Sequence, residues 1–231
     1  MTPHPGQRLE AVSAGVAWAA LVVGLSVTVL TVPVFTSAAS QALGIPASAG
    51  LSVEDTVHLS GLVRAFVADQ DPEALPPEWR GSPAFDAGSV SHLVDVRRAI
   101  AGGRLGTGIA AGLLAVYLAA CVSLRRWDVF ASGMRTGAIV VLALFGIALV
   151  AGLTDFGSFF AAFHGLFFKA GTWTFPYDSM LIRLFPLRFW VTSGAAWAAL
   201  AGFGAAVLAL AARYVPRAVR QVRGSRNPED V

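Results

Sequence analysis

The sequence has little charge and only one cysteine and one lysine among its 231 residues. Charged side chains make up 13% of the chain, whereas soluble domains usually carry about 25%. Hydrophobic residues make up 55%, so the composition excludes an ordinary soluble domain. Because Cys121 has no second cysteine to pair with, no disulfide can form within the chain.

Four long apolar runs approach or reach the roughly 20 residues that a helix needs to cross the hydrocarbon of a bilayer. They predict transmembrane helices at Val12–Phe35, Leu105–Leu124, Thr136–Thr154 and Val191–Ala212. The first run could be a cleaved signal peptide, but a retained helix gives an even number of spans that agrees with the charges. The predicted fold class is an all-α membrane protein with four transmembrane helices and a small extracytoplasmic cap.

Arginines predict the orientation of these spans. The loop 125–135 holds three arginines and one aspartate, and the tail 213–231 holds five arginines and two acids. The positive-inside rule therefore predicts that both are cytoplasmic, together with the N-terminal segment 1–11. The segments 36–104 and 155–190 are then outside and form the cap. The basic tail favours anionic membrane lipids as partners, and no nucleic-acid-binding motif is present.

The first outer segment has clear helix signals. Ser52–Asp55 resembles a capping box, and an apolar stripe at helical spacing follows it. Residues 69–86 are rich in proline and acids, which predicts a loop. Residues 91–98 predict a short helix that Gly102 and Gly103 interrupt before the second span.

The second outer segment begins with a phenylalanine-rich stretch that contains His164. On a helix its phenylalanines form one continuous face, which consists of Phe156, Phe159, Phe160, Phe163 and Phe167. His164 lies at the edge of that face, where the headgroups of a membrane would be. This position suits a catalytic base that acts on lipid esters, but aromatic residues also gather at membrane interfaces without any catalytic role.

His92 is the second candidate base. It is three residues before Asp95, so the two side chains share one face of a helix and the carboxylate could orient the imidazole. The alternative is that Asp95 pairs with Arg98 or forms a surface ion pair. Asp178 could support His164 in a similar way. His58 lies off the apolar stripe of its helix, which favours a solvated role.

The remaining residues restrict the chemistry. The sequence lacks a Gly-x-Ser-x-Gly nucleophile motif, and its histidines do not have zinc-ligand spacing. A thiol nucleophile is disfavoured because Cys121 lies within a predicted span. General acid–base catalysis by histidines, without a metal or cofactor, fits best. Such catalysis needs a substrate that brings its own nucleophile.

The outer segments resemble one known family. The matching residues are His92-x-x-Asp95-Val96, Phe163-His164-x-x-Phe167-Phe168, Trp173, Asp178, Leu181-Ile182 and Pro186-x-x-Phe189. This pattern resembles the bacterial lipoprotein intramolecular transacylases, which are integral membrane proteins. The resemblance implies four spans, an extracellular cap, and catalytic histidines at the positions of His92 and His164.

The resemblance also implies a substrate and a reaction. The substrate is a diacylglyceryl lipoprotein, whose α-amine attacks the sn-2 ester and yields a lyso-form lipoprotein. One histidine takes the amine proton, and the other stabilises the oxyanion or protonates the glyceryl oxygen. Substrate-binding positions are expected at Phe160, Phe163, Phe167 and Trp173, which would confine the acyl chains.

Two alternatives remain open from the sequence. One is a relative that acts on another lipid, because the chain departs from the family pattern at positions such as Ser89 and Val94. The other is a non-enzymatic membrane protein, either a small transporter or an assembly partner. A transporter usually needs polar residues within its spans, which this chain almost lacks. Small-residue faces, as in 102–108, would suit an assembly partner.

Overall fold

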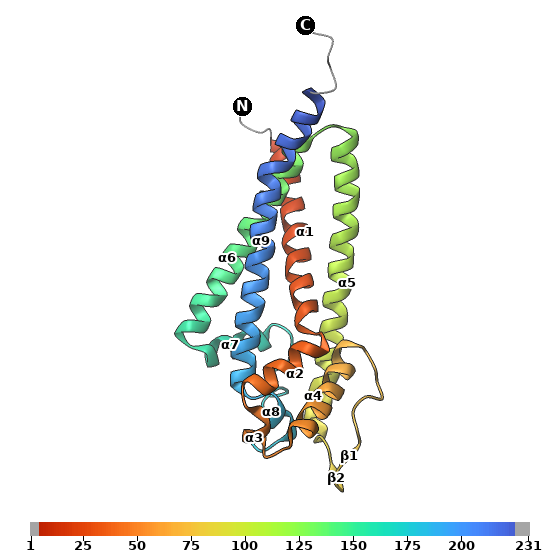
Figure 1. Cartoon of the computed structure of the whole chain (residues 1–231), viewed down its shortest axis with the longest axis vertical. Helices are drawn as coiled ribbons and strands as arrows, with labels where there is room; N and C mark the ends of the chain where they lie inside the picture. The colour runs from red at the N-terminus through yellow and green to blue at the C-terminus, as the bar shows by residue number, and fades with distance from the viewer. Residues whose placement is uncertain (1–4, 225–231) are drawn as a thin grey trace. The chain divides into compact units, whose positions relative to one another are not determined.

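The chain folds almost entirely into helices, as the computed structural model in Figure 1 shows. The model describes residues 5–224. Its helices are α1 (Pro5–Leu30), α2 (Pro33–Ala42), α3 (Ile45–Ala49), α4 (Val53–Ala68), α5 (Ala87–Ser123), α6 (Trp127–Thr154), α7 (Phe156–Gly165), α8 (Met180–Leu184) and α9 (Leu187–Gly224). Residues 1–4 of the predicted N-terminal segment and residues 225–231 of the predicted basic tail lie outside the described residues.

Four of these helices are long and apolar enough to cross a membrane. They are α1, α5, α6 and α9, so the predicted all-α fold with four spanning helices is confirmed. Large aliphatic side chains stand exposed along them, such as Val116, Ile139 and Ile147. Exposed apolar surface on this scale is costly in water and is expected where lipid covers the protein.

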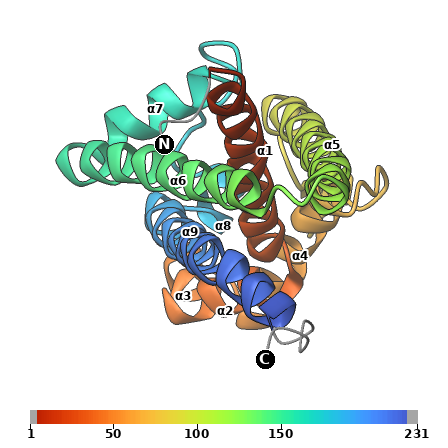
Figure 2. The ribbon, with the colours of Figure 1, turned by 90° about the horizontal axis from the view of Figure 1, so that it is seen from above.

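The described residues divide into two compact units, which we treat separately. The first unit contains the described parts of 1–26, 106–147 and 199–231. Its core joins all four long helices, with Ala19 from α1, Cys121 from α5, Val141 from α6 and Ala205 from α9 (Figure 2). The buried Cys121 therefore contributes to packing and is not available as a nucleophile.

Glycine allows α1 and α6 to approach closely in this unit. A Cβ atom on Gly137 would lie 2.6 Å from the Cβ of Trp18 and 3.1 Å from the carbonyl oxygen of Gly15. Such distances exclude any side chain, so Gly137 fixes the contact between these helices. The glycines at 102, 103, 106 and 108 instead face open space.

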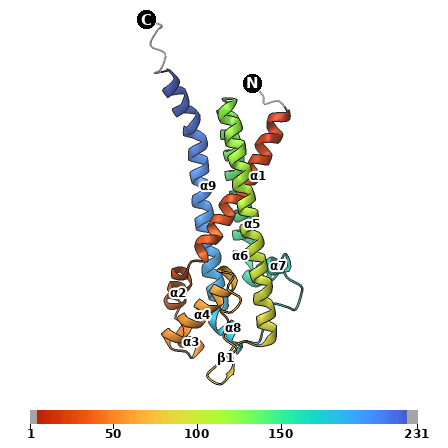
Figure 3. The same ribbon diagram turned by 90° about the vertical axis from the view of Figure 1, so that its right-hand side faces the viewer.

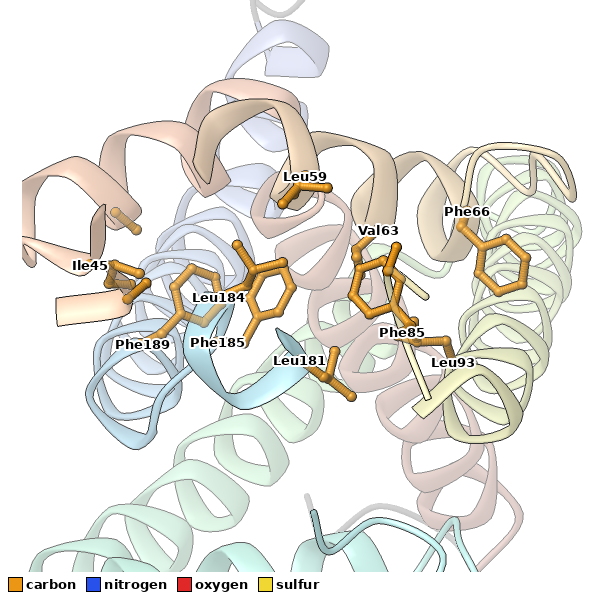
Figure 4. Packing of buried hydrophobic residues seen from close by; sticks show 13 residues of the cluster. Ile45, Leu59, Val63, Phe66, Phe85, Leu93, Leu181, Leu184, Phe185 and Phe189 are labelled. Atoms are coloured by element: carbon orange, nitrogen blue, oxygen red, sulfur yellow. The ribbon is translucent and has the colours of Figure 1, made fainter. Parts of the chain in front are cut away.

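The second unit comprises 27–105 and 148–198, and it contains both segments predicted to form the cap. Helices α2, α3, α4 and α8 pack on one another in this unit (Figure 3). Their shared core holds Ile45, Leu59 and Leu184, each with no exposed surface. It reaches Phe85, just before α5, and Leu93, in the first turns of α5 (Figure 4). Burial of these side chains is the main source of the unit's stability.

Arginine side chains hold the loops of the second unit to its helices. Arg183 of α8 donates to the carbonyl oxygen of Ala49 at the end of α3. Arg97 of α5 donates to the carbonyl oxygen of Gln70 at 2.8 Å, and its guanidinium lies over the ring of Phe66. The first contact satisfies a carbonyl group that the end of α3 leaves without a partner, and the second holds the loop after α4.

Several helix boundaries differ from those expected from the sequence. Helix α6 begins at Trp127, within the predicted loop 125–135, and α9 extends beyond both ends of the predicted span 191–212. Helix α1 ends at Leu30, within the first predicted span, because Pro33 begins α2 and Val32 adopts the extended backbone that precedes a proline. Helix α5 runs without interruption through Gly102 and Gly103. A glycine lowers helix stability by only about 1 kcal/mol, which the long flanking helix tolerates.

The structure confirms the capping box predicted in the first outer segment, but the predicted loop also contains two short strands. Ser52 caps α4 by accepting a hydrogen bond from the backbone N–H of Asp55, as the capping-box pattern predicts. Residues 69–86 are mostly loop but also form a small antiparallel hairpin of β1 (Glu78–Trp79) and β2 (Ser82–Pro83). Its turn contains Arg80 and Gly81 at positive φ, a conformation that favours glycine.

Candidate active site

His164 is positioned by the short helix α7. Asp155 caps this helix, because its carboxylate accepts hydrogen bonds from the backbone N–H of Ser158 at 3.1 Å and from the Ser158 hydroxyl at 2.5 Å. The hydroxyl contact lowers the pKa of Asp155, so the cap stays charged at neutral pH. His164 lies in the last turn of α7 and is buried.

His92 is positioned by the first turns of α5. Asp86 caps α5 through the backbone N–H of Ser89 at 2.8 Å and also accepts a hydrogen bond from the Ser89 hydroxyl at 2.6 Å. These contacts lower the pKa of Asp86 and fix the start of the helix. His92 follows Ser89 by one helical turn, so the cap determines where its ring lies.

The two histidines come together although they are far apart in the sequence. The centroids of their rings are 6.2 Å apart and the ring planes are inclined by 28°. Each residue is 8% exposed. Phe168 contacts both rings, with centroid distances of 4.9 Å to His92 and 5.6 Å to His164. The result is a pair of imidazoles in an aromatic environment.

The tautomer of His164 is set by its own helix. Its Nδ1 atom lies 2.9 Å from the carbonyl oxygen of Phe160, and a carbonyl oxygen can only accept. Nδ1 therefore carries the proton, and the lone pair of the neutral ring is on Nε2. Burial lowers the pKa of His164 below its ordinary value of 6.5. A neutral ring with a free Nε2 lone pair is the form that a general base requires.

Two buried polar atoms of the site lack a partner among the described residues. They are Nδ1 of His92 and Nε1 of Trp173. The Trp173 ring lies 4.9 Å from the His164 ring. An indole N–H can only donate a hydrogen bond, and leaving a buried donor unpaired costs about 1–3 kcal/mol. Such atoms in a candidate site point to an acceptor supplied by a ligand.

The predicted aromatic positions mostly surround His164. The ring centroid of Phe160 lies 3.9 Å from that of His164, and the ring centroid of Phe163 lies 5.9 Å from it. Phe167 follows the end of α7, so it is not part of the predicted continuous helical face. Its ring still packs against that of Phe163, with a centroid distance of 5.2 Å, and the residue is 57% exposed. Phe163 and Phe167 therefore continue the aromatic surface away from the histidines.

The two predicted supporting carboxylates are placed elsewhere. Asp95 lies 3.3 Å from Arg98 and makes no ion pair with His92 among the described residues. This pairing is the alternative that the sequence left open, and it arises because Arg98 occupies the same helical face. Asp178 is exposed in the turn before α8 and has no described contact with His164. His58 is exposed beside Trp79.

Some residues around the histidines were not among the predicted site positions. Phe175 lies 5.5 Å from His92, and Phe168 contacts both rings. Phe168 is adjacent to Phe167 in the matched motif, so the motif carried a signal for it. The position of Phe175 depends on the path of a loop, which no local pattern specifies. Ser89 could have been found from the Asp86-x-x-Ser89 spacing of a helix cap.

A hollow of about 490 Å³ lies on the far side of Phe168 from the histidine pair. It is lined by residues that include Asp95, Arg98, Phe167, Phe168 and Lys169. Neither histidine lines this hollow, but Phe168, which does, also contacts both imidazole rings. Within residues 5–224, no group of three His, Cys, Asp or Glu side chains is placed to hold a metal ion.

Residues 12–190 match the family model described as lipoprotein intramolecular transacylase Lit. The chain belongs to this family. The match covers three of the long helices and both outer segments, and it includes His92 and His164. Family membership makes the protein a membrane acyltransferase, which confirms the predicted enzyme class and rules out the non-enzymatic alternative.

Individual relatives share sequence or fold with this chain. An uncharacterised protein of Aquifex aeolicus (strain VF5) is 26% identical over 164 residues, which is 70% of this chain and 72% of that protein. The crystal structure of the membrane-integral lipoprotein intramolecular transacylase Lit from Bacillus cereus superposes with a TM-score of 0.76 at 15% identity, over 93% of this chain and 98% of that one. A variant of that protein with one histidine replaced by alanine superposes with a TM-score of 0.72 at 16% identity, over 93% of this chain and 96% of that one. These structures establish the shared fold.

Proposed function

We propose that this protein moves the sn-2 acyl chain of a diacylglyceryl lipoprotein to the α-amino group of the same lipoprotein's N-terminal cysteine. The observation that carries the proposal is the buried pair of His92 and His164, in a family of intramolecular lipoprotein transacylases. The substrate supplies both the nucleophile and the ester. The protein therefore needs to move one proton and stabilise one oxyanion, and two histidines suffice for that.

His164 is the general base of this mechanism. The Nδ1–H of His164 donates to Phe160, so Nε2 accepts the proton from the attacking amine. The amine nitrogen bonds to the ester carbonyl carbon, and the carbonyl oxygen becomes an oxyanion. When this intermediate collapses, the bond between the carbon and the glyceryl oxygen breaks. The imidazolium of His164 returns its proton to that oxygen, so no atom or charge is gained overall.

His92 and Trp173 stabilise the oxyanion. Nε1 of Trp173 is a buried donor, and Nδ1 of His92 is one in the tautomer that we assign to it. Neither atom has a partner among the described residues, and the substrate oxygen gives them one. These hydrogen bonds can form to the neutral ester oxygen, and they become stronger as negative charge develops on it. Donors that are oriented in advance in this way are usually the largest electrostatic contribution to catalysis. A neutral His92 suffices for this role, as in other enzymes that use a neutral imidazole as electrophile.

The aromatic surface positions the substrate. Phe160 and Trp173 border His164, and Phe163 and Phe167 extend this surface with exposed area that suits acyl chains. The amine and the ester belong to one flexible molecule, so holding the acyl chains restricts their relative motion. Orientation of this kind can supply about 7–11 kcal/mol of the barrier in the best intramolecular cases. Asp95 and Asp178 have no direct role in this mechanism.

Mass spectrometry tests the proposed reaction. A reporter lipoprotein in the diacylglyceryl form is incubated with the purified full-length protein, and its N-terminal peptide is fragmented. The proposal predicts an acyl chain on the amine and one on the glycerol, with the total mass unchanged. Absence of any acyl movement, with a folded protein, would contradict it and favour a different lipid substrate.

We also propose that both termini are cytoplasmic and that the two outer segments face the extracytoplasmic side. The excess of arginine over acid in 125–135 and in 213–231 supports this orientation. In this orientation the histidines lie on the extracytoplasmic side of the membrane. Alkaline phosphatase fused after residue 231 should be inactive, and the same enzyme inserted in the loop at Asp71 should be active. The reverse pattern would overturn the orientation.

A further inference from the structure

The first unit contains an arginine-lined hollow that the proposed reaction does not use. It has a volume of about 530 Å³, within the range of about 300–1,000 Å³ that is usual for small-molecule sites. The residues that line it include Asp128 and Arg135 of α6, and Ala212, Arg213, Pro216 and Arg217 of α9. We call this feature the arginine hollow. All of it lies within one compact unit.

The spacing of these residues shows that two helix faces build the hollow. Asp128 and Arg135 are seven residues apart, which places them on one face of α6. On α9, Arg213 and Arg217 are one turn apart, and the buried residues Ala212 and Pro216 lie beside them. Small residues at the base leave room, and long arginine side chains stand at the edge.

The charge of the hollow favours an anion. Three arginines stand against one aspartate, so the net charge of the lining is positive. Arg135, Arg213 and Arg217 are all exposed. Arg217 donates to the backbone carbonyl oxygen of Arg213, which positions the Arg217 side chain, and the Arg213 guanidinium lies over the ring of Tyr214. Arginine binds phosphate groups well because its planar fork donates two parallel hydrogen bonds.

The surroundings favour a phosphate that is attached to acyl chains. Both helices belong to the candidate membrane spans. On α6, the exposed side chains of Ile139 and Leu142 follow Arg135 on the same face, and on α9 the exposed side chains of Phe203 and Leu210 precede Arg213. Tyr214 lies beside Arg213, as residues at the headgroup level often do. Apolar surface thus continues from the arginines into the expected hydrocarbon region.

We propose that the arginine hollow binds the phosphate of an anionic glycerophospholipid, whose acyl chains lie along the exposed apolar faces of α6 and α9. Basic pockets between membrane helices are known to hold anionic headgroups. The bound lipid bridges α6 and α9 and so stabilises the four-helix unit. This site is independent of the transacylase reaction, because none of its residues contacts the histidine pair.

The test is a lipid titration of the full-length protein by native mass spectrometry. The probes are dioleoylphosphatidylglycerol, which is anionic, and dioleoylphosphatidylcholine, which has no net charge. The test variant combines Arg135→Gln with Arg213→Gln. The matched control combines Arg8→Gln with Arg125→Gln, which removes the same charge from residues outside the hollow.

The proposal predicts that phosphatidylglycerol binds more tightly than phosphatidylcholine to the unmodified protein and to the control. In the test variant this affinity falls about thirtyfold, as expected for about 1 kcal/mol from each of two arginines. Equal binding of phosphatidylglycerol by the test variant and the control would overturn the proposal. So would the absence of a preference over phosphatidylcholine.

Two further arms of the titration test whether the ligand is a lipid and whether arginine acts through its charge. Inorganic phosphate should not displace phosphatidylglycerol, and displacement at similar concentrations would assign the hollow to free phosphate instead. A variant with Arg135→Lys and Arg213→Lys keeps the charge but loses the planar fork, so its affinity should lie between those of the unmodified protein and the glutamine variant. If the lysine variant bound as weakly as the glutamine variant while unfolding at the temperature of the unmodified protein, the role of charge would be refuted.

Discussion

Nδ1 of His164 lies 2.9 Å from the carbonyl oxygen of Phe160, one helical turn earlier in α7. This contact fixes the tautomer and leaves Nε2 as the basic nitrogen. The same helix places the Phe160 ring 3.9 Å from the imidazole, so one short element supplies the base, orients it and shields it. The proposed division of roles between the histidines depends on this local geometry.

The pH dependence of kcat/KM reports the state of His164. Burial lowers its pKa below 6.5, so the neutral base persists to a lower pH than for an exposed histidine. The substrate's α-amine must also lose a proton, with a pKa of about 7.7–8.0. A plot of log kcat/KM against pH should therefore have a slope of one below the pKa of the substrate amine. The slope should reach two only below pH 6.5, where His164 also becomes protonated. A slope of two that begins above pH 6.5 would contradict a lowered pKa.

Substitutions at the two histidines should distinguish a hydrogen-bond donor at His92 from a base at His164. The amide nitrogen of asparagine lies near the position of Nδ1, so His92→Asn should keep more activity than His92→Ala if Nδ1 is the donor. At His164, alanine, asparagine and glutamine should all reduce kcat by about 100- to 10,000-fold, because none is a base. Equal loss for His92→Asn and His92→Ala, with folding intact, would remove the Nδ1 role.

The indole N–H of Trp173 can be removed alone. Replacement of Trp173 by β-(3-benzothienyl)alanine exchanges the N–H for sulfur and keeps the ring shape. We expect kcat to fall about 100-fold with little change in KM, as for the loss of one oxyanion donor. The same replacement of Trp190, whose N–H donates to Phe185 at 3.0 Å, is the control and should leave kcat nearly unchanged. An unchanged kcat at position 173 would refute the donor role.

Asp95 should be dispensable for catalysis. It pairs with the exposed Arg98, and an exposed ion pair contributes only about 0–1 kcal/mol. Asp95→Asn should therefore leave kcat/KM within about threefold of the unmodified protein, since such a pair is weak. A loss of 100-fold or more in the same reporter assay would instead show that Asp95 orients His92 during the reaction.

Leu184 tests the packing of the second unit. It is completely buried between α8 and its neighbours, so Leu184→Ala should lower the free energy of unfolding by about 2–5 kcal/mol. Leu187 is 56% exposed, so Leu187→Ala is the control and should change stability far less. Thermal unfolding in detergent compares the two variants. Equal melting temperatures would contradict the central place of Leu184 in this core.

Much of the fold was predictable because it depends on local pattern. Length and hydropathy identify α1, α5, α6 and α9, and Ser52 marks the start of α4. The end of α1 could also have been predicted, since Pro33 disfavours the helical conformation at the residue before it. The continuity of α5 was harder to predict, because its glycines weaken a helix without breaking it.

The candidate site was predictable only in part. His92 and His164 are 72 positions apart, and only their motifs marked both. The contact of His164 with Phe160 follows from helical spacing alone. The approach of Phe175 to His92 instead depends on the loop after α7, and the pairing of Asp95 depends on competition between His92 and Arg98. Which residue pairs with Asp95 depends on three-dimensional packing, and the spacing of residues in the sequence does not specify that packing.

A crossover experiment tests the central claim most directly. Two diacylglyceryl reporters are mixed, one with deuterated acyl chains and a light peptide, the other with ordinary acyl chains and an isotopically heavy peptide. Intramolecular transfer predicts that each N-acylated product keeps its original pairing of chain and peptide. Loss of the base predicts that His164→Ala forms product about 100- to 10,000-fold more slowly. Products with exchanged pairings, or equal product from the His164→Ala variant, would contradict the account.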